Sequence, residues 1–449
     1  MGPISIEYAN DNIIFIITSI ILLRSIIWLL FGLTFGINKW AHKLWSFMNI
    51  GIGLSTDKDP ISAAREATRL AGINIHSEKI DLAIVFSSID LSCVSLLKTI
   101  NGLLKGRVPI IGCSSAAIIS NQGMFKHGLA VMLLELPANV YFNIACVRDI
   151  KEKTALNAGR ELGEKLLSGF RDMRRDLSVI FSDGLMDEGS KLIYGLQERL
   201  GKSFPLVGAS ASDNMRFLRT YVYFNQEVLT DSAVGILWGG KLNFGLGIQH
   251  GWKPLGKPRT ITKSEGNIIH EIDGEPAVKI YEEYLARDLT ELQKEIRRIS
   301  ILYPIGIYLP GEQEYLLRNI LSIENNGSLR LQGNAIEGST MRLMIGTKES
   351  CLNATRQALN EAKKILFAPI ADITKSEIKN FVFVFDSVSR YMLLRREANQ
   401  ELEIIKEGFK ETPIIGLYTY GEQAPLKAIS YQGQAYFHNQ TIVMLNIGG

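Results

Sequence analysis

Three pairs of apolar runs follow the same order along the chain. A continuous aliphatic or aromatic run ends in Ser or Asp at 81–90, 177–185 and 381–389. About 20 residues of helical pattern follow each run, and then Pro, two aliphatic residues and Gly, at 108–116, 204–212 and 412–422. Continuous apolar strands are typical of strands covered on both faces, and strand, helix and strand within about 30 residues form a βαβ unit. The pattern therefore predicts three βαβ units.

A further apolar run follows each unit, at 128–136, 231–240 and 440–448, and can extend the same sheet. The predicted fold class is α/β, with repeated βαβ units that form largely parallel mixed sheets in two packed domains. The three units are only weakly similar residue by residue. Chance likeness among α/β segments is therefore the alternative interpretation.

A different pattern separates the second unit from the third. Residues 273–286 contain an Asp-Gly turn and then Pro276, which suits the first turn of a helix. Residues 325–346 predict a hairpin around an Asn-Gly turn and then a strand, with a helix after it. No Gly-, Pro- or Ser-rich linker lies between these pieces. We therefore expect a packed boundary near residue 270, between domains at 48–270 and 271–449.

The longest apolar run, at 13–37, precedes all three units and predicts an N-terminal hydrophobic helix long enough to span a membrane. Its aliphatic residues outweigh the cost of Arg24 near its middle, about 2.5–3.5 kcal/mol on insertion scales. Basic residues follow the run and acidic residues precede it, which predicts a cytoplasmic domain tethered to the cytoplasmic membrane. Two alternatives are a helix that does not span, and a true start at Met48 with residues 1–47 as a misassigned extension.

Composition narrows the function classes. The 449 residues are 46% hydrophobic and 21% charged, as in a folded protein of two or three domains. A net charge of +3 is too small for a nucleic-acid-binding footprint, so no nucleic-acid partner is expected. The four cysteines are far apart with no C-x-x-C spacing, which predicts reduced thiols in a cytosolic setting and no zinc site.

Polar residues follow the apolar runs where parallel strands would end, which is where ligands collect in α/β sheets. The strand-end residues expected to bind a ligand are Ser114, Ser115, Ser182, Asp183, Gly208, Ser210, Asp213, Tyr420, Gly421 and Glu422. Asp386, Ser387 and Thr419 occupy similar positions. These small hydroxyls, carboxylates and glycines predict a pocket for a small polar molecule. The alternative is that they only form turns and helix caps.

Two strand ends also have the outline of a nucleophile elbow. Gly112-Cys113-Ser114-Ser115-Ala116 fits it, and the stretch at 208–212 fits equally well, which lowers the specificity of both. The order Ser114, Asp183, His250 matches a Ser, acid, His triad. A serine hydrolase that uses Ser114 is therefore the enzymatic alternative.

His250 lies in the stretch GLGIQHGWKPLGKPRTIT, near Trp252, Lys253 and Arg259. A histidine beside an aromatic ring and two cations can bind an anionic group or serve as an axial metal ligand, so His250, Trp252 and Arg259 join the predicted binding residues. The alternative is a hydrogen-bonded loop histidine. The sequence contains no P-loop, H-E-x-x-H motif or EF-hand loop, and its Gly-x-Gly at 245–247 is an incomplete dinucleotide fingerprint.

From about Met48 to the end, the chain resembles the FIST family. The similar stretches include IIGCSSAA, VIFSDGL, PLVGASASD, GIQHGWKPLGKPRTIT, EIDGEPAVKIYEEYL, EGSTMRLMIGT and GLYTYGEQAP, in the family's order. The resemblance implies an N-terminal and a C-terminal FIST domain in a sensor for small molecules such as amino acids. Such modules occur with histidine kinases, chemotaxis receptors or cyclic-dinucleotide enzymes, and some relatives are described as haem-binding gas sensors.

The chain departs from the family pattern in two places. Residues 386–390 read Asp-Ser-Val-Ser-Arg where many members have a Ser-Cys-Ala-Gly-Arg-like stretch, and the apolar N-terminal run is additional. No output domain follows Gly449, so we expect the signal to pass to a separate protein. The sequence thus predicts a sensor that binds a small polar ligand and performs no chemistry, with haem as the cofactor alternative.

Overall fold

The computed structural model describes residues 48–448, except 171, 241, 313, 365–378 and 427–433. The predicted membrane anchor at 13–37 lies outside the described residues. Within the described residues, no helix is both long enough and apolar enough to cross a membrane.

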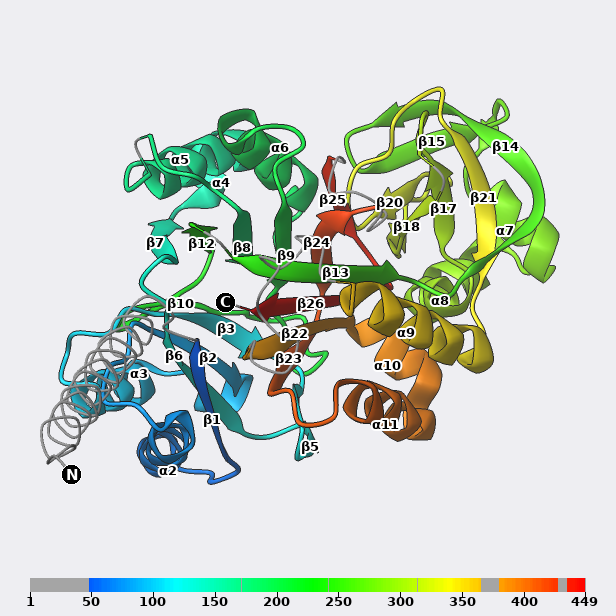
Figure 1. The fold of residues 1–449 in the computed structure, drawn as a ribbon. Coiled ribbons are helices and arrows are strands. Elements are labelled where there is room, and N and C mark those ends of the chain that lie inside the picture. The colour runs from blue at the N-terminus through cyan, green and yellow to red at the C-terminus, as the bar shows by residue number, and fades with distance from the viewer. Residues whose placement is uncertain are drawn as a thin grey trace, which may run out of the picture. The chain divides into compact units, whose positions relative to one another are not determined.

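Three copies of one element order, strand, helix, strand, helix, strand, hairpin and strand, make up most of the described chain (Figure 1). The first copy contains β1 (Asn49–Ser55), α2 (Pro60–Ile75), β2 (Leu82–Ser88), α3 (Val94–Leu103), β3 (Ile110–Ser115), β4 (Ile118–Ser120), β5 (Gly123–Phe125) and β6 (Leu129–Glu135). The second contains β7 (Tyr141–Val147), α4 (Ile150–Lys153), α5 (Ala155–Leu167), β8 (Leu177–Ser182), α6 (Gly189–Leu200), β9 (Leu206–Ser210), β10 (Val222–Phe224), β11 (Glu227–Leu229) and β12 (Ala233–Gly239).

The third copy is interrupted after its first strand by residues 250–347, called here the inserted segment. The third copy contains β13 (Asn243–Gln249), α9 (Lys348–Ala362), β22 (Asn380–Ser387), α10 (Val388–Leu394), α11 (Ala398–Phe409), β23 (Ile414–Thr419), β24 (Gly421–Pro425), β25 (Ala435–His438) and β26 (Ile442–Gly448). The inserted segment contains β14 (Lys253–Glu265), β15 (Ile268–Ile272), β16 (Glu275–Pro276), α7 (Lys279–Leu285), α8 (Leu289–Leu302), β17 (Ile305–Tyr308), β18 (Tyr315–Arg318), β19 (Ile320–Ile323), β20 (Leu329–Leu331) and β21 (Thr340–Ile345).

The three predicted βαβ units are confirmed, but among the described strands parallel pairing is limited to one pair in each copy. β2 pairs with β3, β8 with β9 and β22 with β23 in parallel. The later apolar runs β6, β12 and β26 extend these sheets, as predicted, but antiparallel. The expectation of largely parallel sheets was therefore wrong. Continuous apolar sequence reports burial on both faces, and β6 and β12 are buried in this way whatever their direction.

The repeated Gly after two aliphatic residues has a steric cause. A Cβ on Gly112, Gly208 or Gly416 would lie 1.8–2.4 Å from a main-chain oxygen of the parallel partner strand. Real Cβ atoms do not approach so closely. Glycine at this position therefore allows each parallel pair to form, and it aligns the three copies at the same register.

The copies exchange hairpins in a cycle. β4 and β5 of the first copy join β23 of the third, β10 and β11 of the second join β3 of the first, and β24 and β25 of the third join β9 of the second. In addition, β13 pairs with β26 across the predicted boundary near residue 270. Met48–Gly449 form one compact unit, and the position of the domain boundary stays a prediction.

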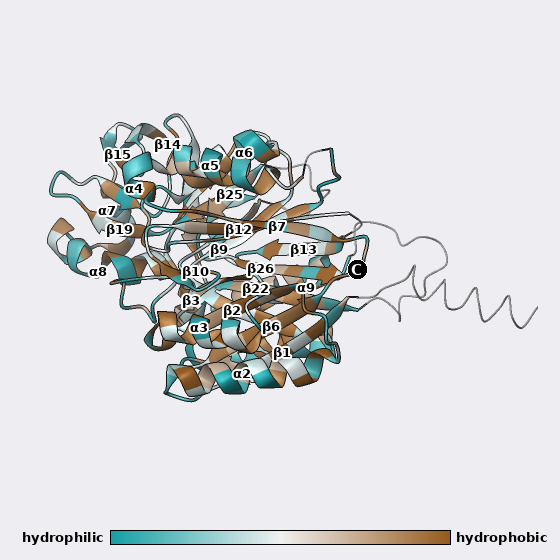
Figure 2. Ribbon diagram, turned by 90° about the vertical axis from the view of Figure 1, so that its left-hand side faces the viewer, coloured by the Kyte–Doolittle hydropathy of each residue, from teal (hydrophilic) through white to brown (hydrophobic). Residues whose placement is uncertain are grey.

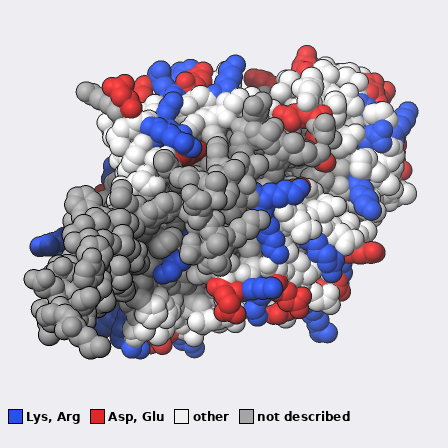
Figure 3. All heavy atoms as spheres, viewed as in Figure 1, with Lys and Arg blue, Asp and Glu red and all other residues white. Residues whose placement is uncertain are grey.

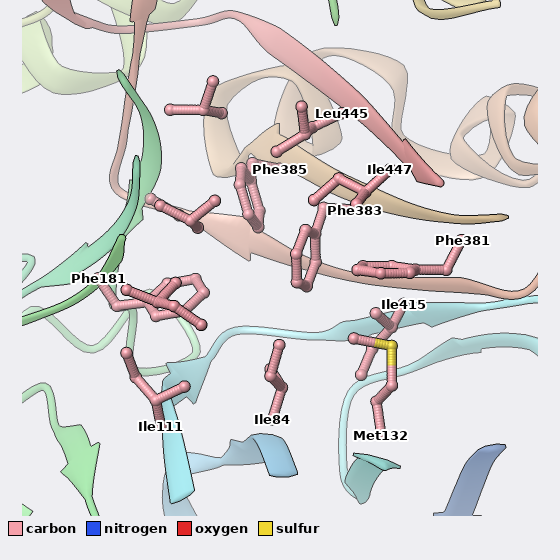
Figure 4. Close-up of a cluster of buried hydrophobic side chains, with 14 of the residues drawn as sticks. Ile84, Ile111, Met132, Phe181, Phe381, Phe383, Phe385, Ile415, Leu445 and Ile447 are labelled. Carbon is pink, nitrogen blue, oxygen red and sulfur yellow. The ribbon is translucent and has the colours of Figure 1, made fainter. Parts of the chain in front are cut away.

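The inner faces of the three sheets share one hydrophobic core (Figure 4). Phe86, Phe181 and Phe385 occupy equivalent positions on β2, β8 and β22, and the ring of Phe181 lies 5.3 Å from Phe86 and 5.9 Å from Phe385. Helices cover the outer faces, for example α2 and α3 on the first sheet and α5 and α6 on the second. Figure 2 shows hydrophobic residues concentrated in the central strands and both residue classes along α2.

The inserted segment has its own core and a sheet whose described strand pairs are antiparallel. The predicted Asn-Gly hairpin is confirmed as β19 and β20. Pro276 does not begin a helix, because the Asp273-Gly274 turn folds it back as β16 opposite Glu271, and α7 starts at Lys279. On the face shown in Figure 3, acidic and basic side chains are interspersed.

Candidate functional site

A cavity of about 500 Å³ lies between the inserted segment and the strand ends of the second and third copies. Its lining residues are Gly184, Leu185, Met186, Asp187, Phe217, Arg297, Arg298, Ile301, Asn319, Ile320, Leu321, Gln332, Ser387, Val388, Ser389, Met392, Thr419 and Tyr420. This volume is in the range of small-molecule binding sites, roughly 300–1,000 Å³.

The core side of the cavity consists of loops that leave the parallel strands at their carboxyl ends. Residues 184–187 follow β8. Ser387 ends β22 and directly precedes α10, and Thr419 ends β23 and is followed by Tyr420. Strand-end loops of this kind place side chains at the position where α/β sheets bind ligands.

The opposite side comes from the inserted segment, which contacts the core through polar groups. The Gln332 amide donates a hydrogen bond to the carbonyl oxygen of Tyr420 at 2.5 Å. The Asn319 amide donates to the Ser389 hydroxyl at 3.3 Å. Arg297 and Arg298 of α8 complete this side, and both are exposed.

One wall of the cavity is an aromatic pair. The rings of Phe217 and Tyr420 are stacked, with centroids 4.5 Å apart and an angle of 11° between their planes. The guanidinium of Arg297 lies 5.9 Å from the centre of the Phe217 ring, within range of a cation–π contact. Phe217 remains 46% exposed.

The loop that carries Phe217 is held by the buried carboxylate of Asp213. This carboxylate accepts hydrogen bonds from the main-chain N–H groups of Phe217, Leu218 and Arg219 at 2.7–2.9 Å, and from the hydroxyl of Tyr420. Asn214, Met215 and Phe217 have positive φ angles of 52–61°, which L-residues adopt at an energetic cost. Asp213 therefore fixes both members of the aromatic pair from behind the cavity wall.

Of the predicted binding residues, Tyr420 lines this cavity, while the strand-end serines lie buried within the core. The Ser114 hydroxyl donates to the carbonyl oxygen of Ser212 at 2.9 Å, and Ser115 donates to that of Ala117 at 2.5 Å. The hydroxyls of Ser182 and Ser210 lie 3.1 Å apart.

Asp183 and the two predicted glycines support nearby backbone. The Asp183 carboxylate accepts from the N–H groups of Leu185 and Asp231 at 2.9 and 2.6 Å, which orders the loop at 184–187. A Cβ on Gly208 would collide with β8, and one on Gly421 would lie 2.3 Å from the Phe437 ring. Both glycines thus allow close packing of neighbouring elements.

Glu422 is fully buried next to Thr419, a lining residue. The Thr419 hydroxyl hydrogen-bonds one of its carboxyl oxygens, and the N–H of Thr441 donates to the other at 3.2 Å. Burial raises the pKa of Glu422 to about 8, so the carboxyl is largely protonated at neutral pH.

Near Glu422, a buried ion cluster surrounds Arg390. Its guanidinium donates to Asp386 at 2.8 Å, to Glu401 and to the carbonyl oxygen of His250 at 2.6 Å. Burial, and then the neighbouring Glu401 carboxylate, raise the pKa of Asp386. The stretch at 386–390 therefore supplies both lining residues and this cluster.

His250 and Trp252 connect the core to α8. The Trp252 N–H donates to Nδ1 of His250 at 2.9 Å, and its indole N–H donates to the carbonyl oxygen of Ile301, a lining residue, at 3.0 Å. Burial lowers the pKa of His250 to about 3, and the hollow beside its ring has a volume of only about 10 Å³. That is the space of one water at most, so the residues around His250 do not fit a haem.

Arg259 is not among the lining residues. It lies on β14 and forms ion pairs with Glu283 and Asp273 inside the inserted segment. Within the described residues, the hydrogen bonds of Ser114, Asp183 and His250 go to other groups, so the predicted triad is not assembled by direct contacts.

The sequence reasoning missed the lining residues of the inserted segment and Phe217. Arg297 and Arg298 lie on a charged amphipathic helix, whose exposed positions are normally charged and carry no signal of their own. The adjacent pair of arginines is the one local sign of a binding function. Phe217 lies in an irregular loop, where hydrophobic periodicity gives no information.

The sequence of this chain matches the models of a known protein family and the sequences of several proteins. A FIST N domain model matches residues 81–275, and a FIST C domain model matches residues 277–425. The chain is 25% identical to the uncharacterized protein MJ1623 of Methanocaldococcus jannaschii over 370 residues, 76% of this chain and 70% of that protein. It is 24% identical to the uncharacterized protein Rv0628c of Mycobacterium tuberculosis over 393 residues, 84% of this chain and 95% of that protein.

Among solved structures, a cyanuric acid hydrolase from A. caulinodans aligns over 89% of this chain and 99% of its own, with 8% identity and a TM-score of 0.36. That likeness is too remote to indicate an activity. The two domain models together match more than half of the sequence, in the order expected of one protein. The chain therefore belongs to the FIST family.

Proposed function

We propose that the protein is a sensor in signal transduction that binds a small ligand, without transforming it, in the cavity between the inserted segment and the strand ends. The cavity itself carries the proposal, because it joins apolar residues, hydrogen-bonding amides and charged groups in a volume of about 500 Å³. FIST domains are consistent with a sensory or signalling role.

The signal would be a change in how the inserted segment contacts the core. Asn319 and Gln332 bridge the two through hydrogen bonds, and Gln440 of the core donates to the carbonyl oxygen of Ser300 at 2.8 Å. Such bonds exchange with water at a small net cost, roughly 0.5–1.5 kcal/mol each. A ligand that bridges both walls, and binds one arrangement of them more tightly than another, would therefore alter this contact.

The output is proposed to lie in a separate protein, such as a histidine kinase, a chemotaxis receptor or a cyclic-dinucleotide enzyme. For localisation, we propose a tether to the cytoplasmic membrane through residues 13–37. The full-length chain should then resist carbonate extraction, while a chain that starts at Met48 should stay in the soluble fraction. Full-length chain in the soluble fraction would exclude the tether.

The binding proposal is tested by filling the cavity. Ser389→Phe places a ring in the lining, and Ser95→Phe makes the same change at an exposed position of α3. A dialysable extract of the native host should raise the melting temperature of the wild type and of Ser95→Phe, but not that of Ser389→Phe. An equal rise in all three would place the ligand elsewhere, and recovery of a chemically altered ligand would favour an enzyme.

A further inference from the structure

The charges of the cavity favour an anion. Arg297 and Arg298 line it, against one described acidic residue, Asp187. Arg298 is exposed and forms no ion pair or hydrogen bond with another described residue. Arg297 uses its Nε to donate to the carbonyl oxygen of Leu321 at 3.1 Å and has no acidic partner in the described chain. A guanidinium presents paired donors that match a carboxylate or a phosphate.

The rest of the lining favours a flat apolar body. Leu185, Met186, Ile320 and Val388 are lining residues, together with the stacked pair of Phe217 and Tyr420. Large apolar side chains are exposed at this site, with Phe217 at 46% and Met392 at 40%. Apolar surface left exposed in a concave site is typical of ligand binding. Aromatic walls of this kind pack well against a planar ring.

The volume favours a ligand larger than a small amino acid. About 500 Å³ corresponds to roughly 17 waters, at roughly 30 Å³ each in the liquid. A ligand that fills this space has on the order of twenty non-hydrogen atoms, if each occupies somewhat less than one water. A ring system with an acidic side group meets that size, whereas an aliphatic amino acid leaves most of the cavity to solvent.

We propose that the cavity selects a planar aromatic anion, whose carboxylate or phosphate binds Arg298 and whose ring lies against the Phe217–Tyr420 wall. This inference rests on the proposed sensory function and names its ligand class. Arg297, next to Arg298 on α8, adds positive charge at the same end. The amides of Asn319 and Gln332 belong to the same side of the cavity, formed by the inserted segment, and provide hydrogen-bonding groups for ring substituents.

The first test uses three indole compounds that differ in charge. Indole-3-acetate is an anion, tryptophol is its neutral counterpart, and L-tryptophan adds an ammonium group. Calorimetric titration of the full chain should give binding of indole-3-acetate at least tenfold tighter than of tryptophol, since a hydrogen bond to a charged group contributes on that scale. Adenosine 5′-monophosphate, titrated in parallel, distinguishes a phosphate from a carboxylate source.

The second test removes the cation. Arg298→Ala should weaken binding of the anionic probe at least tenfold and leave the affinity for tryptophol unchanged. Lys294→Ala removes one charge from an exposed position of the same helix that does not line the cavity, and should have little effect. An equal loss in Lys294→Ala would place the anion in a second hollow, which Lys294 lines together with Arg297 and Arg298.

Three results would overturn the ligand class: no binding of either anion, equal affinity for indole-3-acetate and tryptophol, or tighter binding of L-tryptophan than of both anions. These results do not contradict the proposed sensory function if the host extract still stabilises the wild type but not Ser389→Phe. Loss of that extract effect, by contrast, would remove the proposed function.

Discussion

At Gly208 the missing side chain is what allows β8 and β9 to pair. Gly208→Ala would place a Cβ 2.4 Å from the carbonyl oxygen of Ile180. Either β8 and β9 must move apart, or the backbone at residue 208 must adopt a strained conformation. We expect a loss of about 1–3 kcal/mol in the free energy of unfolding. Gly72→Ala, in helix α2 with open space around it, is the control and should be neutral or stabilising by up to about 1 kcal/mol. Urea unfolding of both variants measures the difference, and equal stabilities would contradict the packing account.

Glu422 predicts a pH dependence of stability. Burial raises its folded-state pKa to about 8 from the ordinary value of 4.5, so the folded chain holds this proton more tightly than the unfolded chain. The resulting stability is fully present below about pH 4.5 and is lost as pH rises through about 8.

Glu422→Gln mimics the protonated carboxyl, because its amide can donate to the Thr419 hydroxyl while its oxygen accepts from the Thr441 N–H. The variant should therefore gain stability relative to the wild type between pH 5 and pH 8. Melting temperatures measured across that range decide the point. A difference that stays constant with pH would show that Glu422 does not titrate there.

The sequence predicts some of the residues that line the cavity but not others. Ser387, Thr419 and Tyr420 were recognised from their positions after apolar runs, and the structure places all three at the cavity. Ser114, Ser182 and Ser210 have the same sequence context but bond to their neighbours inside the core. The sequence around a strand-end serine is the same whether the serine lines a cavity or lies buried in the core. The difference depends on how another copy packs against it.

Among the elements, the loop at 213–220 contains residues with positive φ angles and carries Phe217, which forms part of the aromatic wall of the cavity. Asp213→Asn replaces one carboxylate oxygen, which accepts hydrogen bonds, by an amide nitrogen, which donates them. Some of the main-chain N–H groups of Phe217, Leu218 and Arg219 then lose their hydrogen-bond acceptor. We expect faster hydrogen exchange of residues 214–220 and a loss of about 1–3 kcal/mol in stability. Unchanged exchange in this loop would show that the carboxylate does not hold it.

The order of helices and strands was largely predictable from the sequence. The direction of the strands, and the part of the core that the inserted segment contacts, were not. Continuous apolar runs identified β2, β8 and β22 and their helices, and an Asn-Gly turn identified β19 and β20. The hairpins β4–β5 and β10–β11 have strands of only three residues, too short for a period-2 pattern. Their exchange between copies depends on contacts far apart in sequence, which no local pattern contains.

At the scale of the whole molecule, the hairpin cycle makes the two predicted halves depend on each other. Residues 48–270 would lose the partner of β13 and of β4, and residues 271–449 would lose the partner of β24. Each half expressed alone should therefore lack cooperative unfolding, and the two should fold when coexpressed. A half with a sharp thermal transition of its own would show that the exchanged strands are dispensable.

In the proposed sensor, the ligand binds between the inserted segment and the strand ends. Hydrogen exchange of the full chain, with and without the stabilising ligand purified from the host extract, locates the bound ligand. We predict slower exchange in residues 184–187, in α8 and at the start of α10, with little change in α2 and α5, which lie away from the cavity lining. Protection confined to other parts of the described chain, with none at these three segments, would show that the ligand binds elsewhere.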